Sequence, residues 1–415
     1  MAAETARQFE ALERQAAGLM AVFMRAGCEA VAPAVIQPAN VFLDVIGEGL
    51  RSRTYVFSDP EGHELCLRPD LTVPTCRIHL ARHESATTPA RYCYNGPAFR
   101  FQQHGADAAH PNEFRQAGIE MIGDADHGQA EVEVLELILA ALRTAGLKDR
   151  RVRMGDLGLF QALLADVDIP ERGRQRLRAQ FWRPDAFRQA LGRLSERPAG
   201  SLKGLPADLV TRLDAVLPEG GSKQSAEAVV GQYLEDNAVT LVGVRTLAEI
   251  TESLLAAVVD ARSEPIAGAT ASLIERYLRI KGPATTVADE IDAVLAGAGP
   301  RSRLAVAAYR RRLELLARAG IDPAGIEFAA EFGRNLEYYT GFVFDIVASA
   351  LGAQSPIAGG GRYDNLMQAV GAPCPVAAVG SAIHTQRLLD VVSGAAPGNV
   401  VSGAAQSKAV SGGVS

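Results

Sequence analysis

The sequence predicts an α+β fold, in which an antiparallel sheet core flanked by helices is interrupted by a helical insertion. Between residues 29 and 123, short apolar runs are separated by Pro, Gly and Asn, as in strands joined by turns. From about 158 to 320 the apolar residues recur at helical spacing, and strand-like runs return at 326–348. Strands and helices are therefore segregated along the chain, which is typical of α+β proteins.

The individual elements follow from the same patterns. An amphipathic helix is expected over 5–27, ending at Gly27, because apolar residues stand at helical spacing at Phe9, Leu12, Ala16, Leu19 and Phe23. The pieces 92–101 and 114–123 alternate and should pair as one hairpin, and 128–146 returns to a helical period. A last helix is expected over about 381–393.

These elements divide the chain into four parts. We expect a first part of the core at 1–157, the helical insertion at 158–320 and a second part of the core at 321–393. The remaining residues, 394–415, are mostly Gly, Ala, Ser and Val without a period, so we expect a disordered tail.

Composition excludes several classes of protein. The chain has 415 residues, of which 48% are hydrophobic, and a net charge of −6, whereas a dedicated nucleic-acid binder usually has a basic face. The segment 171–189 has six arginines, but their spacing favours a solvated helix face over a nucleic-acid patch. No stretch approaches the roughly 20 apolar residues that a membrane span needs, and the N-terminus lacks the apolar region of a secretion signal.

The cysteines and histidines indicate neither disulfides nor a metal site. Five cysteines are present without a C-x-x-C pair, so we expect reduced thiols in a cytoplasmic protein: Cys28, Cys66, Cys76, Cys93 and Cys374. The seven histidines are scattered, and no pair stands at H-x-x-x-H spacing on a convincing helix. We expect no metal ion and no cofactor.

The segment LCLRPDLTVPTCR places polar residues where a strand ends. Arg68, Asp70 and Thr72 share one face, and Thr72 is in position to cap a helix that starts near Val73. The alternative is an ordinary strand-to-helix turn without a ligand.

The hairpin strands also carry polar side chains. Gln116, Gly118 and Glu120 share a face of the second strand, and Gly118 leaves space between a carboxamide and a carboxylate for a small polar ligand. Arg100 and Gln102 follow the first strand. The alternative is an edge strand with solvated polar residues.

Two later segments are candidates for the same site. FGRNLEYYTGFVFD brings an arginine and two tyrosines, Tyr338 and Tyr339, before an apolar strand, although interior packing of either tyrosine is the alternative. AGGGRYDNLM has three glycines that allow a close backbone approach. It is not a P-loop, because no Gly-Lys-Ser/Thr follows.

The order of these blocks carries a resemblance to a known family. GPAFRF, a loop and FRQAGIEMIG resemble the motif 2 hairpin of class II aminoacyl-tRNA synthetases. RPDLT, RNLEYYTG and GGGRYD are similar to blocks of histidyl-tRNA synthetase, and the resemblance covers about 1–150 and 325–393. It implies a class II synthetase-like core, a homodimer through that core, and a pocket for free histidine formed by Asp70, Thr72, Arg100, Gln116, Glu120, Arg334, Tyr338, Tyr339 and Tyr363.

The sequence departs from the synthetase where ATP would bind. Gln102 replaces the acidic residue of motif 2, and the loop 102–112 has no Lys or Arg to hold phosphates. In motif 3, His384 replaces the second glycine and Gln386 the glutamate, although Arg100 and Arg387 remain. We expect no counterpart of the family's anticodon-binding domain, because the roughly two dozen residues after motif 3 are too few to form one.

A histidine pocket without an intact ATP site resembles the family of ATP phosphoribosyltransferase regulatory subunits. The resemblance implies a chain with no catalytic residues of its own, which works in histidine biosynthesis with a short-form catalytic subunit. It would be needed for the activity of that subunit and for feedback inhibition by histidine, without tRNA or a membrane. The alternatives are a histidyl-tRNA synthetase or other histidine-adenylating enzyme, a synthetase-like protein with different ATP chemistry, and a tRNA-binding kinase regulator.

Overall fold

Two alternating segments form the longest hairpin of the molecule. β5 (Ala90–Phe99) pairs antiparallel with β6 (Glu113–Ile122), in a register that runs from Ala90 opposite Ile122 to Phe99 opposite Glu113. The hairpin expected over 92–101 and 114–123 is therefore confirmed, with each strand displaced by one or two residues.

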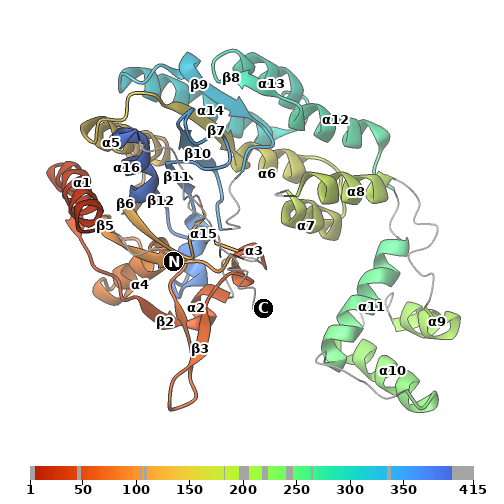
Figure 1. Ribbon diagram of the computed structural model, residues 1–415. Helices are drawn as coiled ribbons and strands as arrows, with labels where there is room; N and C mark the ends of the chain where they lie inside the picture. Colours follow the sequence, from red (N-terminus) through yellow and green to blue (C-terminus); the bar gives the residue numbers. More distant parts are fainter. Residues whose placement is uncertain are drawn as a thin grey trace, which may run out of the picture. The chain divides into compact units, whose positions relative to one another are not determined.

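The structure is a computed structural model (Figure 1). It describes residues 5–43, 48–102, 105–106, 110–181, 183–195, 205–216, 223–239, 246–262, 265–333 and 338–394.

A nine-stranded sheet forms the core, and it is antiparallel except where β1 pairs with β5 and β7 with β9. The large sheet flanked by helices confirms the predicted α+β fold, with these two parallel pairs as additions. Its spatial order is β1 (Glu29–Ala30), β5, β6, β12 (Ala378–His384), β11 (Ala358–Arg362), β10 (Phe342–Val347), β7 (Arg151–Asp156), β9 (Ile326–Ala329) and β8 (Lys281–Pro283).

A smaller sheet follows the first strand of the chain. It has three antiparallel strands in the order β2 (Ile36–Pro38), β4 (Glu64–Leu67) and β3 (Val56–Ser58). Three helices belong to the same stretch of sequence: α2 (Ala39–Leu43), α3 (Glu48–Arg51) and α4 (Thr72–Arg82). The turn from β4 into α4 brings the RPDLT segment to the end of the hairpin, where the Phe99 N–H donates to the Arg68 carbonyl.

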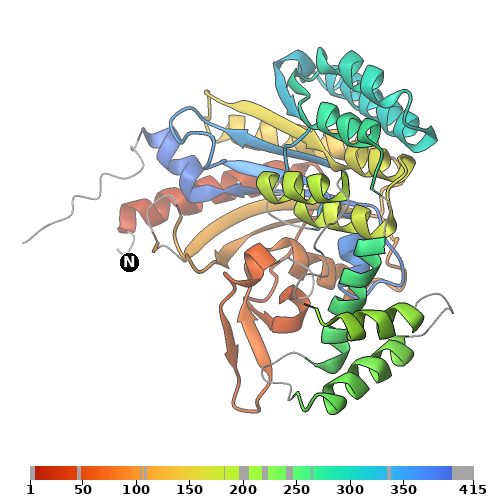
Figure 2. The same ribbon diagram turned by 90° about the vertical axis from the view of Figure 1, so that its right-hand side faces the viewer.

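Three helices pack against β6 and its neighbours β5 and β12, and the first of them also packs against the other two (Figures 1 and 2). They are α1 (Ala6–Arg25), α5 (His127–Thr144) and α16 (Thr385–Ser393). The last helix begins later than expected, because 381–384 belong to β12. This strand is paired on both sides, with β6 and β11, and a short apolar run of that kind cannot be told from a buried helix by its periodicity.

A buried network of charges joins the helices to the sheet. Glu131 of α5 accepts from Arg312 of α14 (Pro300–Arg318) at 2.6 Å, and Arg312 also donates to Asp156 at 2.7 Å. Glu131 accepts from Arg362 at the end of β11 as well, and Arg362 pairs with Asp364 of α15 (Asp364–Ala369) at 2.9 Å. Burial alone would raise the pKa of Glu131, but the two arginines hold it below its ordinary value.

The chain divides into two compact units. The first contains 1–160, 280–293 and 303–415, and the second contains 161–279 and 294–302. The insertion expected over 158–320 is longer than the second unit, because β8 extends the large sheet and the Tyr309 hydroxyl of α14 donates to the Ala284 carbonyl. Residues 395–415, expected to be a disordered tail, lie outside the described residues.

The second unit is built from helices. α9, α10 and α11 share a small apolar cluster made of Leu209, Leu213, Ala226, Val230 and Val258. The helices whose residues lie mainly in this unit or at its borders are α6 (Leu157–Asp166), α7 (Glu171–Gln180), α8 (Pro184–Ser195), α9 (Ala207–Val216), α10 (Lys223–Asp236), α11 (Leu247–Arg262), α12 (Gly268–Leu278) and α13 (Val287–Leu295).

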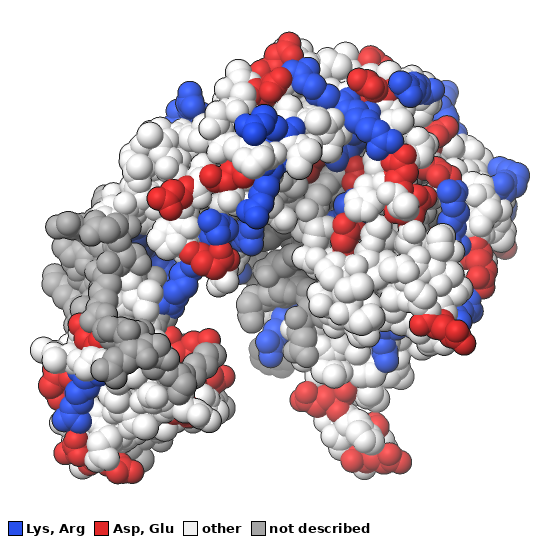
Figure 3. Space-filling view, turned by 180° about the vertical axis from the view of Figure 1, so that it is seen from behind, with Lys and Arg blue, Asp and Glu red and all other residues white. Residues whose placement is uncertain are grey.

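Acidic and basic side chains are interspersed on the face drawn in Figure 3. Among the described residues, no helix combines the length and apolar character needed to cross a membrane.

Candidate functional site

A fully buried carboxylate, Glu120 of β6, lies at the centre of the candidate site. Its Oε1 accepts hydrogen bonds from Thr72 at 2.7 Å and from Tyr94 at 2.9 Å, and its Oε2 accepts one from Tyr363. Burial raises the pKa of Glu120 to about 7, although the three hydroxyl donors act in the opposite direction. A carboxylate so placed changes charge near neutral pH.

A second buried carboxylate, Asp70, stands at the beginning of α4. Its Oδ1 accepts from the Val73 N–H at 3.2 Å, while the Thr72 hydroxyl donates to Glu120. The expectation that Thr72 caps this helix was therefore wrong, because Asp70 takes the free N–H. Burial raises the pKa of Asp70, and the positive charge of Arg100 opposes the shift.

Arg68, expected to share a face with Asp70, does not line the site. Its guanidinium donates to the carbonyl oxygens of Pro97, at 2.7 Å, and of Pro33. Arg68 therefore stabilises β5 and the segment before β2, and it does not face the candidate site.

Two glycines make room for the central carboxylate and its donors. A Cβ on Gly380 would lie 1.6 Å from Glu120 Oε2, so the side chain of Glu120 occupies the space that a larger residue would fill. A Cβ on Gly118 would lie 2.6 Å from the Tyr94 hydroxyl oxygen. The space at Gly118 is thus filled by Tyr94, and the expectation that it is open to a ligand was wrong.

Tyr94 is a site residue that the sequence patterns did not reveal. In the hairpin it stands directly opposite Gly118. A large residue facing a glycine across a strand pair is the signal that could have identified it, once the register was known.

Three tyrosines close another side of the site. The rings of Tyr338 and Tyr339 have centroids 4.9 Å apart, and those of Tyr338 and Tyr363 5.9 Å apart, nearly perpendicular. All three are buried. They come from the segment before β10 and from the end of β11. Arg334, expected beside them, lies outside the described residues.

Three stacked side chains lie at the loop end of the β5–β6 hairpin. The guanidinium carbon of Arg100 is 5.1 Å from the centroid of the Phe114 ring, and the ring of His384 stacks on Phe114 with centroids 4.8 Å apart. The imidazole at the glycine position of motif 3 thus covers one face of the Phe114 ring.

These groups surround a narrow hollow with a cavity volume of about 30 Å³. Glu120 lies behind Thr72 and Tyr363 rather than at the wall. Gln116 Oε1 and Ser381 Oγ are buried and have no hydrogen-bond partner among the described residues, which is rare unless a ligand or water supplies one. The wall is made by Asp70, Thr72, Arg100, Gln116, Tyr338, Tyr339, Gly359, Tyr363, Gly380, Ser381, Ala382 and His384.

Histidines and acidic residues elsewhere are engaged in local contacts. His79 lies in the last turn of α4 and His83 directly follows the helix with an extended backbone, so this pair, four residues apart, is not carried by one helix. Both rings contact the Tyr92 hydroxyl at 3.1 Å, and the second nitrogen of His79 is 2.9 Å from the Ala86 carbonyl. Among the described residues, the one cluster with metal-ligand spacing is the exposed hairpin tip of Asp59, Glu61 and His63.

Sequence comparison relates the chain to two groups of proteins. The family described as Histidyl-tRNA synthetase matches residues 3–209 and 255–388. An ATP phosphoribosyltransferase regulatory subunit of Mesorhizobium japonicum is 33% identical over 390 residues, which are 92% of this chain and 98% of that protein. One of Agrobacterium fabrum is 34% identical over 85% of this chain and 90% of its own length.

Solved structures share the fold. An ATP phosphoribosyltransferase regulatory subunit/histidyl-tRNA synthetase from Bacillus halodurans superposes with a TM-score of 0.66 at 21% identity, covering 94% of this chain and 81% of its own. A histidine–tRNA ligase subunit from Alicyclobacillus acidocaldarius gives 0.60 at 22% identity, covering 95% and 96%. The chain thus has the class II fold of histidyl-tRNA synthetase, and by its sequence it belongs to the family of ATP phosphoribosyltransferase regulatory subunits.

Proposed function

We propose that this chain senses free histidine in the hollow beside Glu120 and regulates a short-form ATP phosphoribosyltransferase catalytic subunit. It would be needed for the activity of that subunit and would transmit feedback inhibition by histidine. It would work in the cytoplasm without tRNA, a cofactor or catalytic residues of its own.

The observation that carries the proposal is the set of buried polar groups around the hollow. Asp70 supplies a negative charge suited to an ammonium group, and Gln116 Oε1 and Ser381 Oγ have hydrogen-bonding capacity left over. Glu120 accepts a hydrogen bond from Tyr94. It would act on a bound imidazole through the hydroxyl groups that donate to it. A free amino acid with a polar ring would satisfy these groups, each of which costs about 1–3 kcal/mol when left unpaired.

The motif 3 region supports a regulatory rather than a synthetic role. His384 stacks on Phe114, and the Gln386 carboxamide donates to Asp390 at 3.1 Å within its own helix, so it points to a helix neighbour. Adenylation needs charge stabilisation on the α-phosphate. The loop 102–112, parts of which lie outside the described residues, has no Lys or Arg to supply it.

The decisive experiment mixes this chain with the short catalytic subunit. We expect copurification, a higher turnover of the catalytic subunit, and reversal of the gain by histidine. Asp70→Asn should copurify but raise the histidine concentration needed for half-inhibition, measured in the same preparation. Asp390→Asn, on α16 and outside the hollow, is the control. Failure to copurify, or inhibition by histidine unchanged in Asp70→Asn, would contradict the proposal.

The alternative, a histidyl-tRNA synthetase or other histidine-adenylating enzyme, makes a different prediction. It requires histidine-dependent exchange of pyrophosphate into ATP by the isolated chain. We expect none. A robust exchange signal that Asp70→Asn abolishes would favour the synthetase and reject the regulatory role.

We further propose that the chain forms a homodimer through the core. The small sheet and the segment after β5 expose large apolar side chains, with 52% of Ile36, 38% of Phe57 and 45% of Phe101 accessible. Large apolar side chains exposed to solvent are common at protein–protein interfaces. Light scattering of the isolated chain should give twice the monomer mass, and Phe57→Glu should shift it toward the monomer. A monomeric wild-type protein at micromolar concentration would reject this part.

A further inference from the structure

A second pocket, separate from the histidine hollow, lies beside the C-terminal half of α5. It has a volume of about 400 Å³, within the range of small-molecule sites. Glu136, Leu139 and Arg143 line it from one face of α5, at helical spacing. Lys148, Arg150 and Val152 line it from the extended segment that leads into β7, where alternate side chains share a face.

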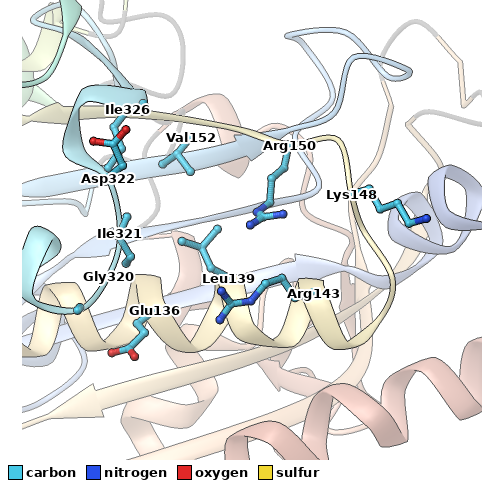
Figure 4. Close-up of a pocket in the computed structure, with 12 residues that line it drawn as sticks. Glu136, Leu139, Arg143, Lys148, Arg150, Val152, Gly320, Ile321, Asp322 and Ile326 are labelled. Carbon is cyan, nitrogen blue, oxygen red and sulfur yellow. The ribbon is translucent and has the colours of Figure 1, made fainter.

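The pocket has an apolar floor. Leu139, Val152 and Ile326 line it, and each is at most 9% exposed. Figure 4 shows the guanidinium groups of Arg143 and Arg150 on either side of Leu139. A ligand in this pocket would therefore contact carbon atoms below and two planar cations beside it.

The charges of the pocket are divided between two groups. Three cations, Arg143, Lys148 and Arg150, come from the end of α5 and the segment after it, and no ion pair joins any of them to a carboxylate within the described residues. Glu136 and Asp322 are set apart from the arginines in Figure 4. The cation Arg143 in the last turn of α5 complements the helix dipole, but Lys148 and Arg150 lie beyond the helix.

We propose that this pocket binds a small sugar phosphate, for which ribose 5-phosphate serves as the probe. Arginine pairs bind phosphate through parallel charge-assisted hydrogen bonds, which accounts for Arg143 and Arg150. The carboxylates of Glu136 and Asp322 would repel a second anion but accept hydrogen bonds from hydroxyl groups. A sugar phosphate has both features, and its carbon face fits the apolar floor. This pocket would bind its ligand whether or not histidine binds in the hollow beside Glu120.

Calorimetry of the full chain with ribose 5-phosphate, inorganic pyrophosphate and unphosphorylated ribose tests the proposal. We expect saturable binding of ribose 5-phosphate and no binding of ribose. The double variant Arg143→Gln, Arg150→Gln should weaken ribose 5-phosphate at least about tenfold, as expected for lost charge-assisted bonds. Arg14→Gln, an exposed arginine on α1, is the matched control.

Glu136→Gln separates the sugar from the phosphate. It should weaken ribose 5-phosphate while leaving pyrophosphate equal or tighter. Binding of pyrophosphate alone, or unchanged affinity for ribose 5-phosphate in the double variant, would overturn the proposal. Titration with histidine on the same samples reports separately on the other site, because none of these substitutions touches it.

Discussion

Thr72 donates its hydroxyl hydrogen to Glu120, with 2.7 Å between Oγ1 and Oε1. This bond joins the first residue of α4 to a residue near the end of β6, 48 positions later. It is one of three hydrogen bonds that this carboxylate accepts from hydroxyl groups. Without them, burial would strongly disfavour its charged form. The protonation of Glu120 is therefore coupled to the stability of the whole site.

Stability should fall as pH rises through neutrality, and Glu120→Gln should remove this dependence. The pKa of Glu120 is raised from 4.5 to about 7, so the folded chain keeps a proton that the unfolded chain has lost. The resulting stabilisation is present below pH 4.5 and lost as pH passes 7. It is on the order of 3 kcal/mol.

Thermal unfolding without histidine at pH 5, 6, 7 and 8 measures this effect. The melting temperature of Glu120→Gln relative to the natural protein should increase steadily over that series. Asp70, whose charge also acts on Glu120, is present in both proteins. Parallel curves would show that Glu120 does not titrate in this range.

Arg312→Met should destabilise the fold by about 3–5 kcal/mol, because it leaves Glu131 and Asp156 as buried charges with fewer partners. The adjacent Arg311 offers a matched control, since it pairs with Asp126 while 54% of its side chain is exposed. Arg311→Met should change little. Urea unfolding measures both, and equal losses in the two variants would mean that burial of the network is unimportant.

Gly380→Ala should abolish histidine binding and destabilise the fold. The added Cβ would lie 1.6 Å from Glu120 Oε2 and would push the carboxylate off its three donors. Gly18→Ala is the control, because nothing lies within 4 Å of its Cβ inside α1. That variant should gain about 0.5–1 kcal/mol. Calorimetry with histidine and thermal melts report the two effects, and full histidine affinity in Gly380→Ala would argue against a role for Glu120.

His384→Gly should cost about 1 kcal/mol through loss of the ring stack on Phe114. It introduces the glycine expected in motif 3, but it should not produce histidine-dependent pyrophosphate exchange, because Gln386 and the loop 102–112, which has no Lys or Arg, are unchanged. His63→Gly, on an exposed hairpin, controls for the glycine substitution. Exchange activity in His384→Gly would mean that this imidazole alone blocks ATP.

The sequence predicted the parts of the fold that depend on local pattern. The β5–β6 hairpin and the α1 helix follow from alternation and helical spacing, and both were placed within two residues. The parallel pairing of β7 with β9 was missed, since it joins segments more than 170 residues apart and no local pattern encodes it. The same reason explains β12, whose two partners come from distant parts of the chain.

Part of the lining of the hollow was expected from the sequence, but its arrangement was not. The motif order identified Asp70, Gln116 and Tyr363, which do line one hollow. It could not show that Tyr94 fills the space at Gly118, because that contact depends on the register of the hairpin. Whether these residues bind histidine remains a prediction for calorimetry.

The position of β12 between β6 and β11 has a consequence for synthesis on the ribosome. β6 is complete at Ile122, but its second neighbour in the sheet, β12, ends only at His384. More than 250 further residues must therefore be translated before β6 can pair on that side. At about 5–20 residues per second, that interval is tens of seconds at the slow end. Until then one edge of the β5–β6 hairpin is unpaired and open to aggregation. Chaperone demand during translation should therefore be greatest before β12 emerges.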